Sequence, residues 1–209
     1  MVILYAIFIK IIQSENEMVK IAFFKEELGI PKGVKVTLEG GHHIRVKGPN
    51  GDITKDFSHV RGINVSIDRD KIIFSTNFPK GGTLALIKTV VSIINNLMIG
   101  VQTNYQYISK ICYSHFPCNC EVKADKHEIH IINFLGERAP RRAKYPENVN
   151  VEVKGDDVYF IGPDKELLGQ AAANVKRACR IRKKDPRVFQ DGVYLYKKML
   201  GEEVIWEIY

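Results

Sequence analysis

The stretch INVSIDRDKIIFS, at Ile63–Ser75, returns further along the chain as VNVEVKGDDVYFI, at Val149–Ile161. Each copy alternates apolar and polar residues, passes through a charged turn and alternates again, which is typical of a β-hairpin with one buried face. A helical pattern follows each hairpin, after Gly82 and after Asp164. The second copy begins 86 residues after the first, an offset too long for a solenoid repeat and suited to two tandem domains.

The sequence therefore predicts an α+β fold of two tandem, internally duplicated domains, each a mainly antiparallel sheet with one packed helix. Its 209 residues and 45% hydrophobic content suffice for two small cores. The two sheets are expected to superpose, with a helix near 83–99 equivalent to one near 165–180. We expect an N-terminal extension over 1–17, a first domain over 18–100, a connecting strand over 101–107, a second domain over 108–182 and a basic C-terminal tail over 183–209.

The first helix has the apolar spacing of one buried stripe. Gly100 is placed to end it. Because the helix is nearly uncharged after Lys88, we expect part of its other face to be covered, by the second domain or by a partner. The stripe consists of Ile87, Val90, Val91, Ile94, Leu97, Met98 and Val101.

Before that helix, residues 27–56 alternate in the manner of β-strands, with breaks at Gly40-Gly41 and at Pro49-Asn50-Gly51 that predict two hairpins. Neither glycine cluster has the spacing of a phosphate-binding loop. At the N-terminus, Val2–Ile12 is apolar but interrupted by Lys10, and it is shorter than the ~20 residues that span a membrane. We expect it to be an edge strand or an upstream extension, peripheral to the fold and not crossing a membrane.

No catalytic site, cofactor or metal is predicted. Cys118 and Cys120 form a C-x-C without a second pair of ligands at short spacing, so a metal site is the less favoured alternative to two positions on one face of a strand. The other cysteines are Cys112 and Cys179, and no signal peptide is recognisable, which favours a reducing cytosolic compartment. An enzyme is disfavoured because the sequence shows no nucleophile motif, metal spacing or phosphate loop.

A long strand is predicted from Thr103 to Ser114, with Tyr105, Tyr107, Ile111 and Tyr113 on one side and Gln106 and Lys110 on the other. A row of tyrosines can stack nucleic-acid bases. Aromatic residues on one side of a strand are more often part of a core, and we favour that interpretation.

The net charge of +7 is concentrated in two segments. Four basic residues lie in 138–144, within an expected loop from Asn133 to Pro146, and seven lie in 176–187 against one acid, Asp185. The rest of the chain is slightly acidic. Two arginine-rich segments in one domain suit recognition of a phosphate backbone. The predicted RNA-binding residues are Arg138, Arg141, Arg142, Lys144, Lys176, Arg177, Arg180, Arg182, Lys183, Lys184 and Arg187, together with Lys110 on the preceding strand. Asp185 and Asp191 are expected to hold turns by local hydrogen bonds.

Several short motifs occur in one order along the chain: KGPNG at 47–51, TVVSIINNLMIGV at 89–101, HFP at 115–117, NFLGE at 133–137, DKELLGQAAANVKRA at 164–178 and DPRVFQDGVY at 185–194. In these motifs the chain resembles the archaeal and eukaryotic branch of large-ribosomal-subunit protein six, called protein nine in the older eukaryotic naming. The resemblance covers roughly residues 18–197 and leaves out the two ends of the chain. Where the family usually carries further basic residues before HFP, this chain keeps Lys110 but has Gln106 and Ile108.

The resemblance implies a two-domain protein bound to large-subunit ribosomal RNA near the sarcin-ricin loop and the region where translational GTPases bind. The partners so implied are that RNA and neighbouring large-subunit proteins, in the cytoplasm, with no membrane and no small-molecule substrate. A free RNA-binding regulator would carry the same basic segments. Co-sedimentation with large subunits through a high-salt wash separates the two hypotheses.

Overall fold

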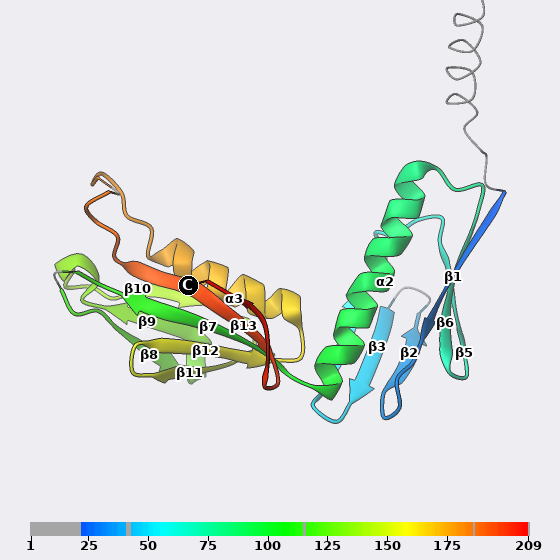
Figure 1. Ribbon diagram of the computed structural model, residues 1–209, viewed down its shortest axis with the longest axis horizontal. Helices are drawn as coiled ribbons and strands as arrows, with labels where there is room; N and C mark the ends of the chain where they lie inside the picture. Colours follow the sequence, from blue (N-terminus) through cyan, green and yellow to red (C-terminus); the bar gives the residue numbers. More distant parts are fainter. Residues whose placement is uncertain (1–21, 41–42, 115, 186, 209) are drawn as a thin grey trace, which may run out of the picture.

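The computed structural model describes residues 22–40, 43–114, 116–185 and 187–208, which form two lobes (Figure 1). The expected extension over 1–17, with its edge strand at Val2–Ile12, lies outside these residues, as do His115 and Pro186. The first lobe is built from two three-stranded antiparallel sheets, β1-β6-β5 and β2-β3-β4, and one helix. Its elements are β1 (Phe23–Gly29), β2 (Lys35–Glu39), β3 (His43–Gly48), β4 (Gly51–Asp56), β5 (Asn64–Asp68), β6 (Lys71–Asn77) and α2 (Gly81–Gln102).

The second lobe contains a five-stranded antiparallel sheet in the order β11-β12-β7-β13-β14, a three-stranded sheet in the order β10-β9-β8, and one α-helix. Its elements are β7 (Tyr105–Cys112), β8 (Asn119–Lys123), η1 (Ala124–Lys126), β9 (Glu128–Ile132), η2 (Phe134–Gly136), β10 (Arg141–Lys144), β11 (Asn150–Lys154), β12 (Asp157–Gly162), α3 (Lys165–Ala178), β13 (Gly192–Leu200) and β14 (Glu203–Glu207).

The predicted fold class is confirmed by a shared strand order. The order β1-β6-β5 in the first lobe corresponds to β7-β12-β11 in the second, β2-β3-β4 corresponds to β8-β9-β10, and α2 corresponds to α3. The two repeated hairpins have the same geometry, because Asp68 pairs with Lys71 at one turn and Lys154 with Asp157 at the other. Each lobe is therefore one copy of a strand, a three-stranded meander, a hairpin and a helix.

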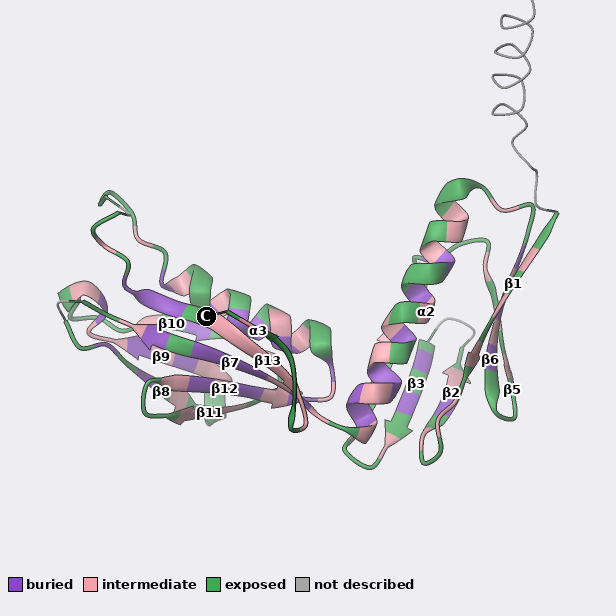
Figure 2. Ribbon diagram, viewed as in Figure 1, coloured by how far each residue is buried: buried purple, intermediate pink, exposed green. Residues whose placement is uncertain are grey.

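Each lobe has its own buried core, visible as the purple strips on the strands and helices in Figure 2. In the first lobe the stripe of α2, including Ile87, Ile94 and Leu97, packs with Ile44 and Phe74 of the sheets. By length and composition α2 is apolar enough to cross a membrane, but its apolar stripe is buried against the sheets of its own lobe. Tyr105 and Tyr107 are buried in the core of the second lobe, as the core interpretation predicts, but Tyr113 lies beyond the end of β7 and is 45% exposed.

Gly100 does not end α2, contrary to expectation. The helix continues to Gln102, and Gly100 is buried where the chain of the second lobe passes against it. A Cβ atom at this position would collide with the carbonyl of Pro163. Gly100 is therefore required for a close approach of two backbones, and not for a helix end. The same contact covers the C-terminal turns of α2, whereas Ala85, Lys88 and Ser92 remain exposed.

Two further expectations are corrected. Residues 105–107, expected within the connecting strand over 101–107, belong to β7, the central strand of the five-stranded sheet. The expected tail over 183–209 is a loop only as far as Asp191; β13 then pairs with β7 along its length, and β14 pairs with β13. The duplicated unit alone did not predict these strands, because they are added to the open edge of β7 after the second copy is complete.

Candidate nucleic-acid interface

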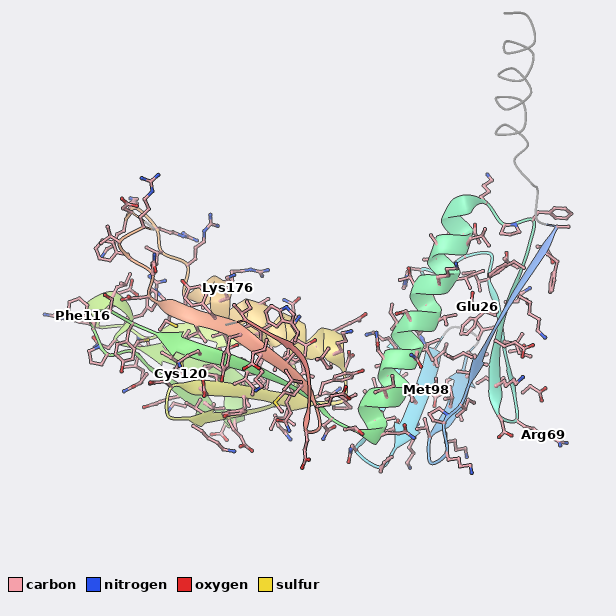
Figure 3. All side chains as sticks on the ribbon, viewed as in Figure 1. Glu26, Arg69, Met98, Phe116, Cys120 and Lys176 are labelled. Carbon is pink, nitrogen blue, oxygen red and sulfur yellow. The ribbon has the colours of Figure 1, made fainter. Side chains whose placement is uncertain are left out.

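Most of the predicted basic residues lie on the C-terminal end of α3 and on the long loop that leads from it to β13; Figure 1 shows this loop at one end of the second lobe. Figure 3 labels Lys176 on α3 on the side from which this loop projects. Eight exposed residues form what we call the basic surface: Arg138 after η2, and Lys176, Arg177, Arg180, Arg182, Lys183, Lys184 and Arg187 on α3 and the following loop, residues 180–191, which we call the basic loop. Among the described residues, none of these eight forms an ion pair with a carboxylate.

The sequence of α3 explains why basic side chains face solvent at its C-terminal end. Asp164 caps the N-terminus by accepting a hydrogen bond of 2.8 Å from the backbone N–H of Glu166. The residues Leu168, Ala171, Ala172 and Val175 form the buried stripe, which leaves Lys176 and Arg177 in the last turn, exposed and favourably placed on the helix dipole.

Arg141 is the exception among the predicted RNA-binding residues, because its guanidinium is occupied within the protein. Its Nε and Nη2 donate to the two carboxylate oxygens of Glu137 at 2.8 and 2.6 Å. Its Nη1 donates to the backbone carbonyls of Ala178 and Arg180, each at 3.0 Å, and its Cζ lies 4.3 Å from the centre of the Phe134 ring. These hydrogen bonds raise the pKa of Arg141 and lower the pKa of Glu137.

The contacts of Arg141 tie β10 to the end of α3. The last carbonyls of a helix lack partners within the helix, and here Arg141, held by Glu137 and Phe134, donates to the carbonyl of Ala178 at the end of α3 and to that of Arg180 just beyond it. Asn174 adds a second tie, since its Nδ2 donates to the carbonyl of Lys144 at 2.9 Å. Arg141 thus positions the basic loop beside η2. Sequence analysis could have found this role in the spacing of Glu137 and Arg141, which lie four residues apart with opposite charges.

Arg142, Lys144 and Lys110 lie apart from the basic surface. Residues 141–144, expected in a loop, form the strand β10, and because side chains alternate across a strand, Arg142 and Lys144 face away from Arg141. On that side a hydrogen bond from His130 lowers the pKa of Glu128, and the positive charges of Lys144 and Arg142 lower it further. Lys110 is exposed on the face of β7 opposite the buried Tyr107, and therefore faces away from α3.

The basic loop is held by its two aspartates. Asp185 accepts a hydrogen bond of 2.9 Å from the backbone N–H of Arg187, and its carbonyl accepts from Val188 and Phe189; this confirms the expected local turn. Asp191 is buried and accepts from the N–H of Ser114 at 3.0 Å. It therefore fixes the end of the loop to a distant segment, and not to a local turn.

Two hollows flank Arg177 and Arg180, which line both. The first, of about 470 Å³, lies between α3 and β13, and the second, of about 570 Å³, lies between α3 and η2. Phe189, Gln190 and Tyr194 line the first hollow, and sequence analysis did not select them. The signal available was the position of Phe189 and Tyr194 directly after the basic run that ends at Arg187.

Three of the four cysteines, Cys118, Cys120 and Cys179, are part of the second core, and Cys112 is half-buried. Cys118 and Cys120 are buried there, and burial raises the pKa of the Cys120 thiol to about 12, so both are neutral thiols at physiological pH. Within the described ranges, no group of three His, Cys, Asp or Glu side chains is placed to hold a metal ion.

Comparison with known families accounts for both copies at once. The model of the family described as Ribosomal protein L6 matches residues 30–104 and 116–192, one range in each lobe. The chain belongs to the ribosomal protein L6 family. The resemblance read from the sequence is thereby confirmed, and the L6 match ends at the first residue of β13.

Archaeal members of the L6 family match over nearly their whole length. The chain is 42% identical over 183 residues to the large ribosomal subunit protein uL6 of Saccharolobus solfataricus, covering 88% of this chain and 99% of that protein. It is 44% identical over 179 residues to uL6 of Sulfurisphaera tokodaii, with 85% and 95% covered. It is 45% identical over 172 residues to uL6 of Methanocella arvoryzae, with 82% and 96% covered.

Proposed function

We propose that this protein is a structural constituent of the large ribosomal subunit in the cytoplasm and binds ribosomal RNA through the basic surface of its second lobe. The observation that carries the proposal is the set of eight exposed cations at one end of that lobe that have no carboxylate partner among the described residues. Such cations contact phosphate oxygens and release counterions from RNA on binding. The L6 match and the names of the archaeal relatives supply the ribosomal context.

The proposal has a defined geometry. Lys176 and Arg177 stand on a helix, and the basic loop is fixed at one end by Arg141 and at the other by Asp191. Cations on a rigid scaffold lose less conformational entropy on binding than cations on a free tail. Arg142, Lys144 and Lys110 face other directions and are proposed to make fewer or weaker RNA contacts.

We further propose that the bound RNA lies near the sarcin-ricin loop and the GTPase-binding region, with other large-subunit proteins as neighbours. The role is structural, and no residue is assigned to catalysis. The support for this location is the family resemblance alone, so cross-linking of the basic surface to identified RNA nucleotides is the measurement that tests it.

Co-sedimentation tests the ribosomal assignment itself. Large subunits are washed in high salt, and the protein is followed by immunoblotting. A structural constituent stays with the subunits through the wash, because many contacts besides exposed ion pairs hold it. A free RNA-binding regulator dissociates, because its affinity falls steeply with salt, and its release in the wash would contradict the proposal.

A further inference from the structure

We propose that the hollow between α3 and β13 accepts one unstacked base of the bound RNA, with the phosphate of the same nucleotide in the neighbouring hollow. This inference rests on the proposed function and names the part of the RNA that the site takes. A volume of about 470 Å³ is ample for one nucleobase. Sequence-specific RNA recognition commonly uses bases extruded from loops and bulges, stacked on aromatic side chains.

The floor of this hollow is apolar and uncharged. Val193 and Cys179 lie at it and are 2% and 5% exposed. Burial raises the pKa of the Cys179 thiol to about 11, so the sulfur is neutral at physiological pH. Such a floor suits the flat face of a base, because the base can lie on it without covering a charged or unpaired polar group.

Tyr194 forms a wall of the hollow and is already fixed in place. Its ring packs against Gly192, where a Cβ atom would come within 2.8 Å of the ring carbons. Its hydroxyl donates to the backbone carbonyl of Gln190 at 3.2 Å, and the Lys176 ammonium lies 5.8 Å from the ring centre. The ring is nevertheless 38% exposed. An ordered, partly exposed aromatic ring stacks on a base with little further loss of entropy.

Phe189 is held in a comparable way at the loop side of the hollow. Its backbone N–H donates to the carbonyl of Asp185 at 3.0 Å, and the Lys184 ammonium lies 4.5 Å from its ring centre. The hydrogen bond and the contact with Lys184 therefore hold the Phe189 ring in a fixed position next to the cations of the basic loop.

The neighbouring hollow has the opposite character. It has a volume of about 570 Å³ and is lined by Arg182 and Lys184 in addition to the two shared residues, Arg177 and Arg180. One nucleotide joins a flat apolar base to an anionic phosphate, which matches an apolar and a basic hollow separated by two shared arginines. An acidic protein segment would need an aromatic residue next to its carboxylate to fill both hollows, whereas every nucleotide joins a planar base to a phosphate, so the pair of hollows favours a nucleotide.

Photocross-linking in assembled large subunits tests the inference. Three versions of the protein carry Tyr194→p-azidophenylalanine, Arg182→p-azidophenylalanine and, as a control on β12 at a residue that lines neither hollow, Tyr159→p-azidophenylalanine. The probe at 194 is expected to label a single ribosomal RNA nucleotide, which chemical probing identifies as unpaired. The probe at 159 is expected not to label this nucleotide. The probe at 182 labels RNA near the same nucleotide.

The outcomes separate the inference from the proposed function. If the probe at 182 labels RNA while the probe at 194 labels a paired nucleotide, a protein or nothing, the base site is overturned and the RNA-binding function stands. If neither probe labels RNA, both fail.

An affinity measurement on a ribosomal RNA fragment gives an independent readout. Tyr194→Ala is expected to weaken binding about 5- to 150-fold, the range for losing one stacked base, with an unchanged salt slope because no phosphate contact is lost. Tyr194→Phe keeps the ring and is expected to bind as the wild type does, which also controls for folding. Tyr159→Ala is the matched loss of a half-buried tyrosine. Weakening by Tyr159→Ala equal to that by Tyr194→Ala, or a loss of affinity in Tyr194→Phe as large as in Tyr194→Ala, would overturn the base site.

Discussion

The two lobes share a topology but differ in where their described cations find carboxylate partners. In the first lobe Arg45 on β3 donates to Asp52 at 2.9 Å and to Glu39 at 3.2 Å, and Lys71 pairs with Glu27 at 2.9 Å. In the second lobe Arg141 is the one cation around the end of α3 that is paired with a carboxylate among the described residues, whereas Lys123, Lys154 and Lys197 on the sheets are paired as in the first lobe. The difference teaches that one fold can hold cations in ion pairs on its sheets and leave those at one helix end without described carboxylate partners, as the proposed RNA contacts need.

The largest effect is expected from removing the free cations. Replacing Arg182, Lys183 and Lys184 together by Ala should lower the salt slope of RNA binding by about 2 to 3 and the affinity about 100-fold in 0.1 M salt. The matched control replaces Lys32, Lys35 and Lys47, which are exposed in the first lobe. Binding to a ribosomal RNA fragment is measured across a salt series. An equal loss in the control would show that the two lobes bind RNA alike.

The second effect compares a glycine in each helix. Gly100→Ala in α2 should cost about 2 kcal/mol of unfolding free energy, because the added Cβ collides with the Pro163 carbonyl. Gly169→Ala in α3 has its nearest neighbour, the Tyr107 ring, at 3.9 Å, and should stabilise by about 0.5 to 1 kcal/mol through helix propensity. Urea unfolding of both variants measures the difference. A gain in stability for both would mean that the close approach at Gly100 is not maintained.

The third effect tests whether Arg141 positions the basic loop. Arg141→Lys keeps the charge but loses the fork that reaches Glu137 and two carbonyls. RNA affinity should fall about tenfold, that is by about 1.4 kcal/mol, with an unchanged salt slope, since the number of phosphate contacts is the same. Arg45→Lys in the first lobe makes the same chemical change and should leave RNA affinity as it was. A reduced salt slope in Arg141→Lys would instead indicate that Arg141 touches phosphate directly.

The smallest effect is a change in titration. Hydrogen bonds from Arg141 lower the pKa of Glu137 below its usual 4.5, so this pair stabilises the folded state at neutral pH, and its contribution is lost as pH falls through the folded pKa. The contribution is modest because Glu137 is 42% exposed. In Arg141→Gln the pKa of Glu137 should return toward 4.5, and in Arg45→Gln that of Asp52 should rise likewise. Carboxyl titration by NMR measures both, and a Glu137 pKa that stays low without Arg141 would contradict the contact.

Much of the fold could be predicted because apolar residues recur at regular intervals in each copy. Their spacing alone predicts the hairpins at 63–75 and 149–161 and the buried stripe of α2. Gly100 was misread because glycine near a helix end usually marks its stop, and only the tertiary contact with Pro163 shows otherwise. The strands β13 and β14 were missed because nothing in the first copy corresponds to them.

The candidate site was predictable in composition but not in arrangement. Charge counting located the segments 138–144 and 176–187, yet it could not tell Arg141, held by Glu137, from the free Arg142 beside it. Likewise it could not show that β10 turns Arg142 away from α3. Which cations are free depends on partners brought in by folding, and that information is not local in the sequence.

The joint at Pro163 has a consequence for how the molecule tumbles. Gly100 and Gly51 of the first lobe pack against Pro163, and next to it Lys55 pairs with the buried Asp164 and with Glu166 of the second lobe. With backbone contact and ion pairs on one short segment, we expect the lobes to rotate in solution as a single elongated body. NMR relaxation should therefore give one anisotropic diffusion tensor that fits amides of both lobes, and Gly100→Ala should split it into two.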